Sequence, residues 1–283
     1  MSKGALPAGG AGRRRAITTL AVGAVVVVAV LFVVAALAAV AVNGGTSSTV
    51  PSATNRPAPG PTPDRAVPDT AAAGWDVPGE DAIASRPMGV FPVEAAQPHT
   101  LSARSPGPAM PLPTATDRTG AVDRGFPRTP EGALAQLKAL DETGMRGLDP
   151  DAYALAYQAL ALPAAPAVTA TTLDQIATGT RSKGGLPGSG PVTGLTAAYQ
   201  VDAGLIKGST DRGNFVVPCV LGELSVVTTS SVVRVGVGDC QAMRWVDGAW
   251  AISPTTLPVL APATWPGSEE AVRAGYRAVS SGA

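Results

Sequence analysis

The stretch FVVPCVLGELSVVTTSSVVRVGVGDCQAMRWV, residues 215–246, decides the fold of this 283-residue chain. Apolar side chains alternate with polar or small ones on both sides of Thr229-Ser230, a period-two pattern that predicts two antiparallel strands. A hairpin that turns at Thr229-Ser230 pairs residues whose numbers add to 459. The predicted register therefore places Cys219 directly opposite Cys240.

This register predicts a disulfide. Directly opposed residues of an antiparallel pair have α-carbons about 4.5–5.5 Å apart, which is within disulfide range. We expect a structural bridge between Cys219 and Cys240, because the acidic Asp239 beside Cys240 would raise the pKa of a thiol rather than activate it. A bulge at Gly236 or Gly238 would break the register and the bridge with it.

The register also sorts the side chains of the hairpin between two faces. The expected core face carries Val216, Val220, Leu224, Val226, Val233, Val235, Val237, Met243 and Trp245. The face of the two cysteines is the poorer one, with Glu223, Ser225, Arg234, Gly236 and Gly238. Because alternate strand residues point to opposite faces, Trp245 is expected in the core and its neighbour Arg244 is not read as a ligand contact.

Helix signals precede the strands. Thr129-Pro130-Glu131 supplies an N-cap, a proline at the first helical position and an acid in the first turn, and Gly144 and Gly147 end this helix. Asp149-Pro150-Asp151 repeats the start signal for a second helix, which runs to about Ala161. The two helices are expected to form a helical hairpin.

The strands follow in one block, joined by short polar connections. They are expected over 192–206, 215–227, 232–246 and 249–253. A last helix is expected to start at Ser268, with Val272, Tyr276 and Val279 on one face. Helices followed by an antiparallel meander indicate an α+β fold.

Residues 16–42 contain no charged side chain and exceed the roughly 20 apolar residues that a transmembrane helix needs. Arg13, Arg14 and Arg15 directly precede this run, so the positive-inside rule predicts a cytoplasmic tail over 1–15 and an extracytoplasmic C-terminal part. The alternative is a cleaved signal peptide, whose apolar region is typically about 7–15 residues long. The length of the run favours the uncleaved anchor in the cell membrane.

The rest of the chain divides by composition. Residues 43–74 form a Pro- and Ala-rich linker, 75–124 an irregular strap that packs on the folded module, and 125–280 the extracytoplasmic domain. Continued disorder is the alternative for 75–124. The zero formal charge of the chain hides a basic tail and an exported part of net charge −4, so direct binding to nucleic acid is not expected.

No residue set points to chemistry. His99 is the only histidine and lies in a Pro-rich stretch, which excludes a metal site of several histidines and disfavours a Ser-His-Asp triad. No C-x-x-C pair occurs, which excludes zinc ribbons and iron–sulfur clusters. We therefore expect a protein that is not an enzyme, with no catalytic, cofactor-binding or metal residues.

Two other features have structural explanations. The acids are assigned to helix starts and solvated helix faces rather than to a carboxylate cluster; they are Glu131, Asp141, Glu142, Asp149 and Asp151. The glycine-rich run 184–190 lacks the Lys-Ser/Thr ending of a P-loop and does not open onto a helix, so it is read as a flexible connection.

Three motifs resemble those of a known group. They are the segments GFPRTPEGA at 125–133, FVVPCVL at 215–221 with GDCQAMRW at 238–245, and WPGS at 265–268 with AGYR at 274–277. They are similar to segments of actinobacterial single-pass membrane proteins that are associated with integrative and conjugative elements. The resemblance covers about residues 75–280, and no activity comes with it.

The layout also resembles, remotely, the periplasmic scaffold subunit of type IV secretion and conjugation machines. That resemblance implies a helical hairpin on a curved antiparallel sheet, the cone of the cystatin-like or nuclear-transport-factor-two-like class. It implies an assembly or scaffold role with protein partners from the apparatus, and it allows a homo-oligomer. The alternative is a cell-envelope module that binds a ligand in the cone-shaped pocket; a hydrolase ranks third because a second histidine is missing.

Overall fold

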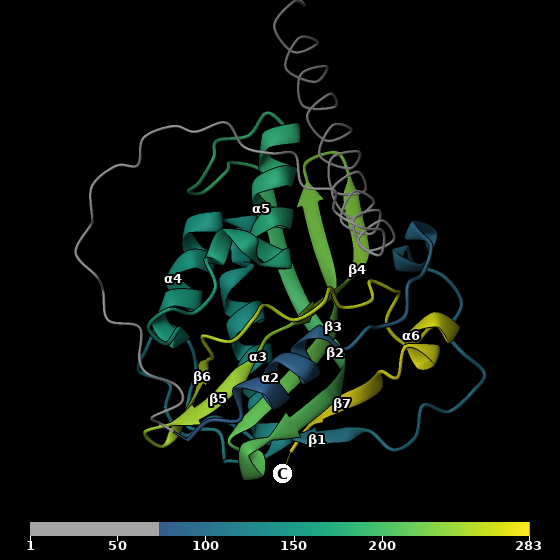
Figure 1. Cartoon of the computed structure of the whole chain (residues 1–283). Helices are drawn as coiled ribbons and strands as arrows, with labels where there is room; N and C mark the ends of the chain where they lie inside the picture. Colours follow the sequence, from purple (N-terminus) through teal and green to yellow (C-terminus); the bar gives the residue numbers. More distant parts are fainter. Residues whose placement is uncertain (1–73, 283) are drawn as a thin grey trace, which may run out of the picture.

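The computed structural model describes residues 74–282, which Figure 1 shows in colour. The basic tail 1–15, the expected transmembrane helix over 16–42 and all but the last residue of the expected linker 43–74 lie outside the described residues. Within residues 74–282, no helix combines the length and the apolar composition needed to cross a bilayer.

The described residues form helices around one seven-stranded sheet. The helices are α2 (Val77–Ser85), α3 (Pro130–Gly144), α4 (Pro150–Leu160), α5 (Thr172–Lys183) and α6 (Glu269–Arg273). The strands are β1 (Met110–Leu112), β2 (Leu195–Thr210), β3 (Phe215–Thr228), β4 (Val232–Cys240), β5 (Met243–Val246), β6 (Ala249–Ile252) and β7 (Arg277–Ser281). The order is β1-β7-β2-β3-β5-β6, with β4 paired to β3, and all pairs except β1–β7 are antiparallel. The expected α+β class is confirmed.

The helical hairpin forms as the capping signals predict. The hydroxyl of Thr129 accepts a hydrogen bond from the backbone N–H of Gly132 at 3.0 Å, and the Asp149 carboxylate accepts one from the N–H of Asp151 at 3.1 Å. The two helices approach closely at Gly144, where an added Cβ would lie 2.7 Å from the Tyr153 ring. A glycine at this position therefore ends α3 and also permits its contact with α4.

The predicted register of the central hairpin is confirmed. Cys219 lies opposite Cys240 and Val227 opposite Val232, with no bulge between these pairs. The expected strand 232–246 is however divided into β4 and β5, because residue 241 faces Pro218. Pro218 accepts a hydrogen bond from the N–H of Gln241 at 3.3 Å but has no N–H to return.

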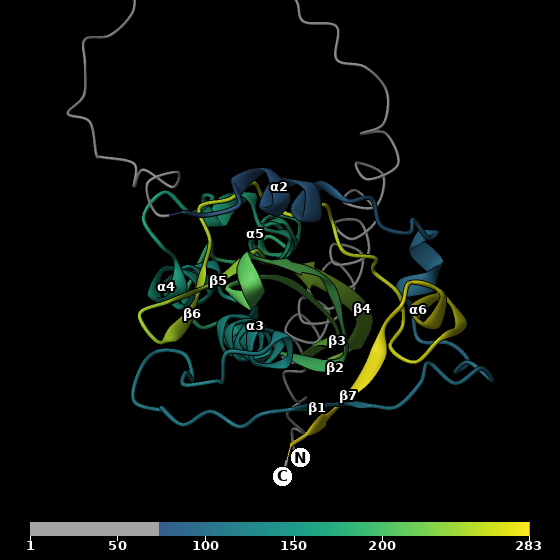
Figure 2. The same cartoon turned by 60° about the horizontal axis from the view of Figure 1, so that its bottom comes forward.

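The sheet curls into a half-barrel with two differently covered faces. Figure 2 shows α3 on the concave side of β2, β3 and β4, and α2 and α6 outside the curl. The concave face is the core face expected from the register, and its side chains pack against α3, α4 and α5. On this face Trp245 is only partly buried and meets Trp250 edge to face, with ring centroids 5.4 Å apart.

The cysteine face is polar at one end and buried at the other. Near the hairpin turn, the exposed guanidinium of Arg234 forms two hydrogen bonds with the Glu223 carboxylate. Toward the other end a second apolar cluster is covered by α2 and α6, and it includes Ile83, Phe215, Val217, Cys219, Leu221, Cys240, Ala271 and Tyr276. The expectation of a poorer face therefore holds for the end near the turn only.

Helix α5 is absent from the sequence-based expectation. Its N-cap is Thr171, and its buried apolar side chains are few: Leu173, Ile176 and Ala177. The other buried positions of this helix carry polar side chains, as Thr180 and Arg181 show. A helix whose buried face is half polar gives a weak amphipathic pattern, which explains the omission.

The segment 75–124 packs on the domain, but it is not irregular throughout. Helix α2 begins after Asp76, whose carboxylate accepts a hydrogen bond from the N–H of Gly79 at 3.1 Å. Strand β1 joins the sheet beside β7. The expected last helix is also shorter than predicted: it starts at Ser268 but stops before Gly275, which has a positive φ of 93°. Tyr276 and Val279 therefore belong to the approach to β7 and to β7 itself.

Candidate binding pocket

The two cysteines predicted to pair form a disulfide on the convex side of the sheet. Their α-carbons are 4.1 Å apart, and both side chains are buried. The sulfur of Cys240 lies 3.8 Å from the sulfur of Met88, which belongs to the segment that follows α2. The disulfide thus supports a wall to which this segment attaches.

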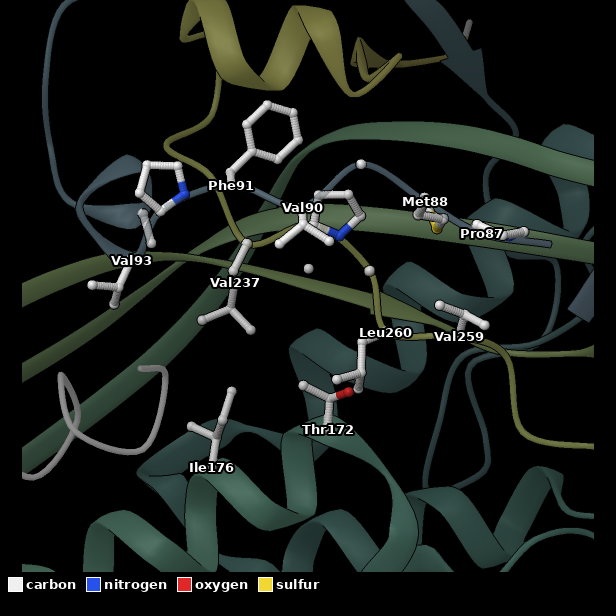
Figure 3. A pocket seen from close by; sticks show the side chains of 17 residues that line it. Pro87, Met88, Val90, Phe91, Val93, Thr172, Ile176, Val237, Val259 and Leu260 are labelled. Atoms are coloured by element: carbon white, nitrogen blue, oxygen red, sulfur yellow. The ribbon is translucent and has the colours of Figure 1, made fainter. Parts of the chain in front are cut away.

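A pocket of about 240 Å³ lies beside this wall, at the edge of the sheet formed by β4. Figure 3 shows Val237 of β4 pointing toward Thr172 and Ile176 of α5, with residues 87–93 on the opposite side. The segment 259–263 closes a third side. No sequence feature predicted this pocket, because four separate parts of the chain form it.

The pocket opens because two neighbouring segments part between two hydrogen-bonded contacts. The N–H of Val259 donates to the carbonyl of Ala84 at 3.0 Å, and the N–H of Trp265 donates to the carbonyl of Ala95. Between these contacts the chain carries prolines, which have no N–H for a ladder of hydrogen bonds; they include Pro87, Pro92 and Pro262.

Two glycines let the second of these segments lie directly against β4. A Cβ on Gly238 would lie 2.6 Å from the carbonyl oxygen of Pro262, and one on Gly236 would lie 1.9 Å from that of Thr264. These are the glycines at which a bulge would have broken the register. The structure uses them instead for close backbone approach, which seats the segment that closes the pocket.

The lining is almost entirely apolar. None of its 17 residues is charged, and Thr172 supplies the only polar side chain. Val90 and Val259 line the pocket and yet are 54% and 37% exposed, so the apolar surface continues from the pocket to the outside. Such a site can hold an apolar group, and it offers no nucleophile, acid or base.

Two cations lie at the end of the pocket where Val259 contacts Ala84. The ammonium of Lys207 donates a hydrogen bond at 2.7 Å to the same Ala84 carbonyl, and the Arg86 guanidinium donates to the carbonyl of Lys207 at 2.7 Å. Burial and the charge of Arg86 lower the pKa of Lys207 to about 8. Among residues 74–282, neither cation forms an ion pair with a carboxylate.

The expected surface acid Asp141 is instead buried in the concave core, which corrects its assignment to a solvated helix face. Both of its carboxylate oxygens lack a hydrogen-bond partner, and burial, together with the nearby charge of Asp239, holds its pKa well above the usual range. Burial also raises the pKa of Asp239 to about 6. Glu131, Asp149 and Asp151 lie at the helix starts, as expected.

All four tyrosines of the chain lie close enough to Asp239 for its charge to act on them. All of them are buried, and this burial, with a smaller contribution from the charge of Asp239, raises the pKa of each: Tyr153, Tyr157, Tyr199 and Tyr276. Three of the hydroxyls donate to backbone carbonyls of Pro166, Val237 and Pro262. Tyr153, Tyr157 and Tyr199 belong to the packed concave core, whereas Tyr276 belongs to the convex cluster and lines a hollow beside α6.

Arg244, for which the sequence indicated no ligand contact, is buried at the other end of the convex face. It forms ion pairs with Glu80 of α2 and with Asp211, the latter at 2.6 Å, and its guanidinium lies 3.9 Å from the centre of the Trp75 ring. The Thr255 hydroxyl donates to the second oxygen of Glu80. This cluster fastens α2 to the sheet, and sequence reasoning missed it because its members lie far apart in the chain.

The glycine-rich run 184–190 is held in place, in contrast to the expected flexible connection. The buried guanidinium of Arg181 donates to the carbonyls of Pro187 and Gly190, and also to those of Gly147 and Leu148. The run follows α5, so it ends a helix rather than opening one. Arg181 therefore joins the glycine-rich run to the turn of the helical hairpin.

The remaining candidates are not brought together. His99 is paired with Glu270 at 3.1 Å on the surface, and its pKa is raised by the Gln97 carbonyl and the Glu270 carboxylate. A wider hollow of about 510 Å³ lies between α3, β1 and β2, where Lys138 and Glu142 form an ion pair with each other. In the described range 74–282, no three His, Cys, Asp or Glu side chains are grouped to hold a metal ion.

Comparison with known proteins does not place the chain in a group. No protein family, no characterised protein and no solved structure matches it. The fold and the pocket are therefore interpreted from their own geometry.

Proposed function

We propose that this chain is a single-pass membrane protein that presents its α+β domain outside the cell as a binding domain. The predicted span over 16–42, the arginines that precede it and the paired cysteines support this arrangement, because disulfides persist in oxidising compartments. The observation that carries the binding role is the apolar pocket with an exposed apolar rim.

The first candidate partner is a protein of a conjugative-transfer or secretion apparatus, which the domain would help to assemble. The motifs at 125–133, 215–221 and 238–245 support it through their resemblance to conjugative-element proteins. The curled sheet with a helical hairpin on its concave side also fits a variant of the cystatin-like or nuclear-transport-factor-two-like cone. The exposed valines Val90 and Val259 offer an anchor site for an apolar side chain of such a partner.

The second candidate is a cell-envelope ligand-binding module, and the pocket is the specific observation that favours it. Its position differs from the expected cone-shaped pocket, because the concave side of the sheet is filled by α3 and its neighbours. The open space lies instead at the β4 edge, under the segments 87–96 and 259–263.

Topology is tested by single cysteines in the full chain, since the native pair is bonded and does not react. We expect a membrane-impermeant maleimide to label Ser105→Cys in intact cells and to leave Ser2→Cys unlabelled. The reverse pattern would overturn the proposed function.

The binding role is tested by a photo-crosslinking amino acid placed at Val90, with the equally apolar and 66% exposed Leu155 on α4 as the matched control. We expect a discrete product at Val90 and none at Leu155. An extracytoplasmic or channel subunit of the apparatus in that product supports the scaffold candidate, and a lipid or small molecule supports the ligand candidate. Equal, diffuse products at both positions would contradict a binding pocket.

A further inference from the structure

We propose that the pocket at the β4 edge holds the hydrocarbon chain of an amphiphile whose head group is anionic, taken from the membrane to which the domain is tethered. This inference rests on the second candidate function and names its ligand class. It is argued from the size of the pocket, its lining, its rim and the charges at one end.

The size of the pocket fits one thin chain. Its volume is about 240 Å³. An apolar cavity of about 150 Å³ is known to bind benzene, and sites for drug-sized molecules measure roughly 300–1,000 Å³. The volume of this pocket lies between these limits. It therefore suits part of a single hydrocarbon chain, which is longer than benzene but narrower than a drug-sized molecule.

The side chains of the lining favour an apolar ligand group over a polar one. A hydroxyl or amide moved into it would lose its hydrogen bonds to water, and only the Thr172 hydroxyl could replace them among the side chains. Three of the lining residues, Pro87, Pro92 and Pro262, also lack a backbone N–H. Methylene groups meet no such penalty, since burying each of them is favourable.

The rim shows where the chain would leave the pocket. Large apolar residues exposed among 74–282 are few, and they are Val90, Leu101, Leu155, Val227, Val232 and Val259. Two of these, Val90 and Val259, line the pocket. A chain that emerges between them stays on apolar surface until it reaches the cationic end.

The charges at that end determine the sign of the head group. Lys207 and Val259 donate to the same carbonyl of Ala84, so the ammonium lies beside the rim, and Arg86 donates to the backbone of Lys207. Lys207 is buried and Arg86 is exposed beside it, and neither forms an ion pair with a carboxylate among the described residues. An anionic head group, either a carboxylate or a phosphate, would relieve the repulsion between these two cations.

The membrane is the nearest source of such amphiphiles. The predicted span ends at residue 42 and the described fold begins at 74. Even a fully extended polyproline segment rises only about 3.1 Å per residue, so the linker keeps the domain within roughly 100 Å of the bilayer. Both phospholipids and free fatty acids are available there.

The test uses the full chain in nanodiscs of phosphatidylcholine that carry a trace of phosphatidylglycerol with a diazirine at the end of one acyl chain. After irradiation, the labelled peptides are identified by mass spectrometry. We expect label within 87–96 and 259–263, with phosphatidylcholine that bears the same diazirine giving several-fold less. Label on the span 16–42 alone, or label spread evenly over the domain, would overturn the proposal.

Two variants make the test specific. Val237→Phe extends a ring into the pocket, and we expect it to lower the pocket label about tenfold. Val232→Phe is the matched control on the same strand, 62% exposed and outside the pocket, and it should leave the label unchanged. If both variants label like the natural chain, the pocket is not the site.

Variants on the surface cover the case in which Val237→Phe fails to fold. Val90→Asp places a carboxylate on the exposed rim and should reduce the label, whereas Leu155→Asp should not. Arg86→Gln should reduce the preference for phosphatidylglycerol over phosphatidylcholine about fivefold, with the exposed Arg118→Gln as its control. If Arg86→Gln keeps the same preference for phosphatidylglycerol over phosphatidylcholine, the inference that the head group is anionic is wrong.

Added dodecanoate identifies the source of the chain. If dodecanoate reduces labelling by the phospholipid, free fatty acids are ligands as well. If it does not, the bound hydrocarbon chain comes from bilayer phospholipid. Both outcomes support an anionic amphiphile in the pocket. A pocket that crosslinks to protein and excludes both amphiphiles would overturn the lipid inference and leave the scaffold candidate intact. Because a nanodisc exposes both sides of the bilayer, this result is independent of the topology test.

Discussion

The two faces of the sheet are closed in different ways. On the concave face, helices α3, α4 and α5 fill the curl with interlocking side chains such as Leu137 and Leu140, which share one core with Tyr199 of β2. On the convex face, α2 and α6 cover only part of the surface, and the rest is spanned by Pro-rich segments without regular structure. The pocket at the β4 edge lies between these segments and α5, and its lining includes Val237 and Ile176 of the concave core.

This difference shows that regular backbone structure determines where a domain is densely packed and where it leaves a cavity. A helix presents a continuous apolar stripe that can be packed to the density of a crystal. A segment with a proline at every fourth position, as at Pro254, Pro258, Pro262 and Pro266, cannot extend the sheet and touches it only at chosen points. The space between those points is where a ligand can enter.

The largest expected effect comes from unfastening α2 on the convex face. Arg244→Met leaves the buried Glu80 and the partly buried Asp211 without their cation, and we expect the free energy of unfolding to fall by about 3–5 kcal/mol. Pulse proteolysis of the full chain in urea measures this change. Arg234→Met, which breaks the exposed pair with Glu223, is the control and should change it by about 1 kcal/mol or less.

Removing the disulfide should have the next largest effect. The bridge closes a loop with a sequence separation of 21 residues, which in the loop-entropy model is worth a little over 3 kcal/mol, roughly. Cys219→Ala with Cys240→Ala should therefore lower the midpoint of urea unfolding, and the natural chain in reducing agent should match the double variant. Equal stability of the oxidised and the reduced protein would show that the disulfide does not stabilise the pocket wall.

The concave face should respond to pH. The pKa of the buried Asp239 is raised to about 6, so the folded chain holds a proton that the unfolded chain releases near pH 4. The contribution of Asp239 to the free energy of unfolding should thus be fully present below pH 4 and fall by up to about 3 kcal/mol as the pH rises through 6, and the raised pKa of Asp141 acts in the same direction. Asp239→Asn keeps an oxygen for the hydrogen bond from Gln241 and should remove the part of the slope that comes from Asp239. A profile that keeps its full slope would place the titration elsewhere.

The smallest effect on stability is expected at the rim of the pocket. Val90→Ser and Val259→Ser shorten exposed side chains, and the free energy of unfolding should stay within about 0.5 kcal/mol. The same variants should weaken the retention of an amphiphile, measured by native mass spectrometry of the full chain. Loss of stability without loss of binding would reverse the roles assigned to the two faces.

The sequence predicted those parts of the fold in which one local rule applies. The hairpin register follows from the turn at Thr229-Ser230, and it places Cys219 opposite Cys240, as found. The starts of α3 and α4 follow from the residues Thr129 and Asp149, as found. In each case neighbours in the chain determine the structure.

The sequence did not predict features that need partners from distant parts of the chain. Asp141 resembles a surface acid in its helix until the sheet folds over it, and Arg181 resembles a solvated cation until the glycine-rich run closes around it. The pocket depends on where two Pro-rich segments separate after meeting at Val259 and Trp265. The transmembrane span, the orientation of the chain and its partners stay predictions.

The contrast between the open β4 edge and the packed interior of the curl is tested most directly by xenon, which enters dry apolar cavities. A crystal of the protein under xenon pressure is predicted to show the gas beside Val237, Ile176 and Val90, and none among the residues that α3 packs against the curl. Xenon inside the curl, or no xenon at the β4 edge, would contradict the account.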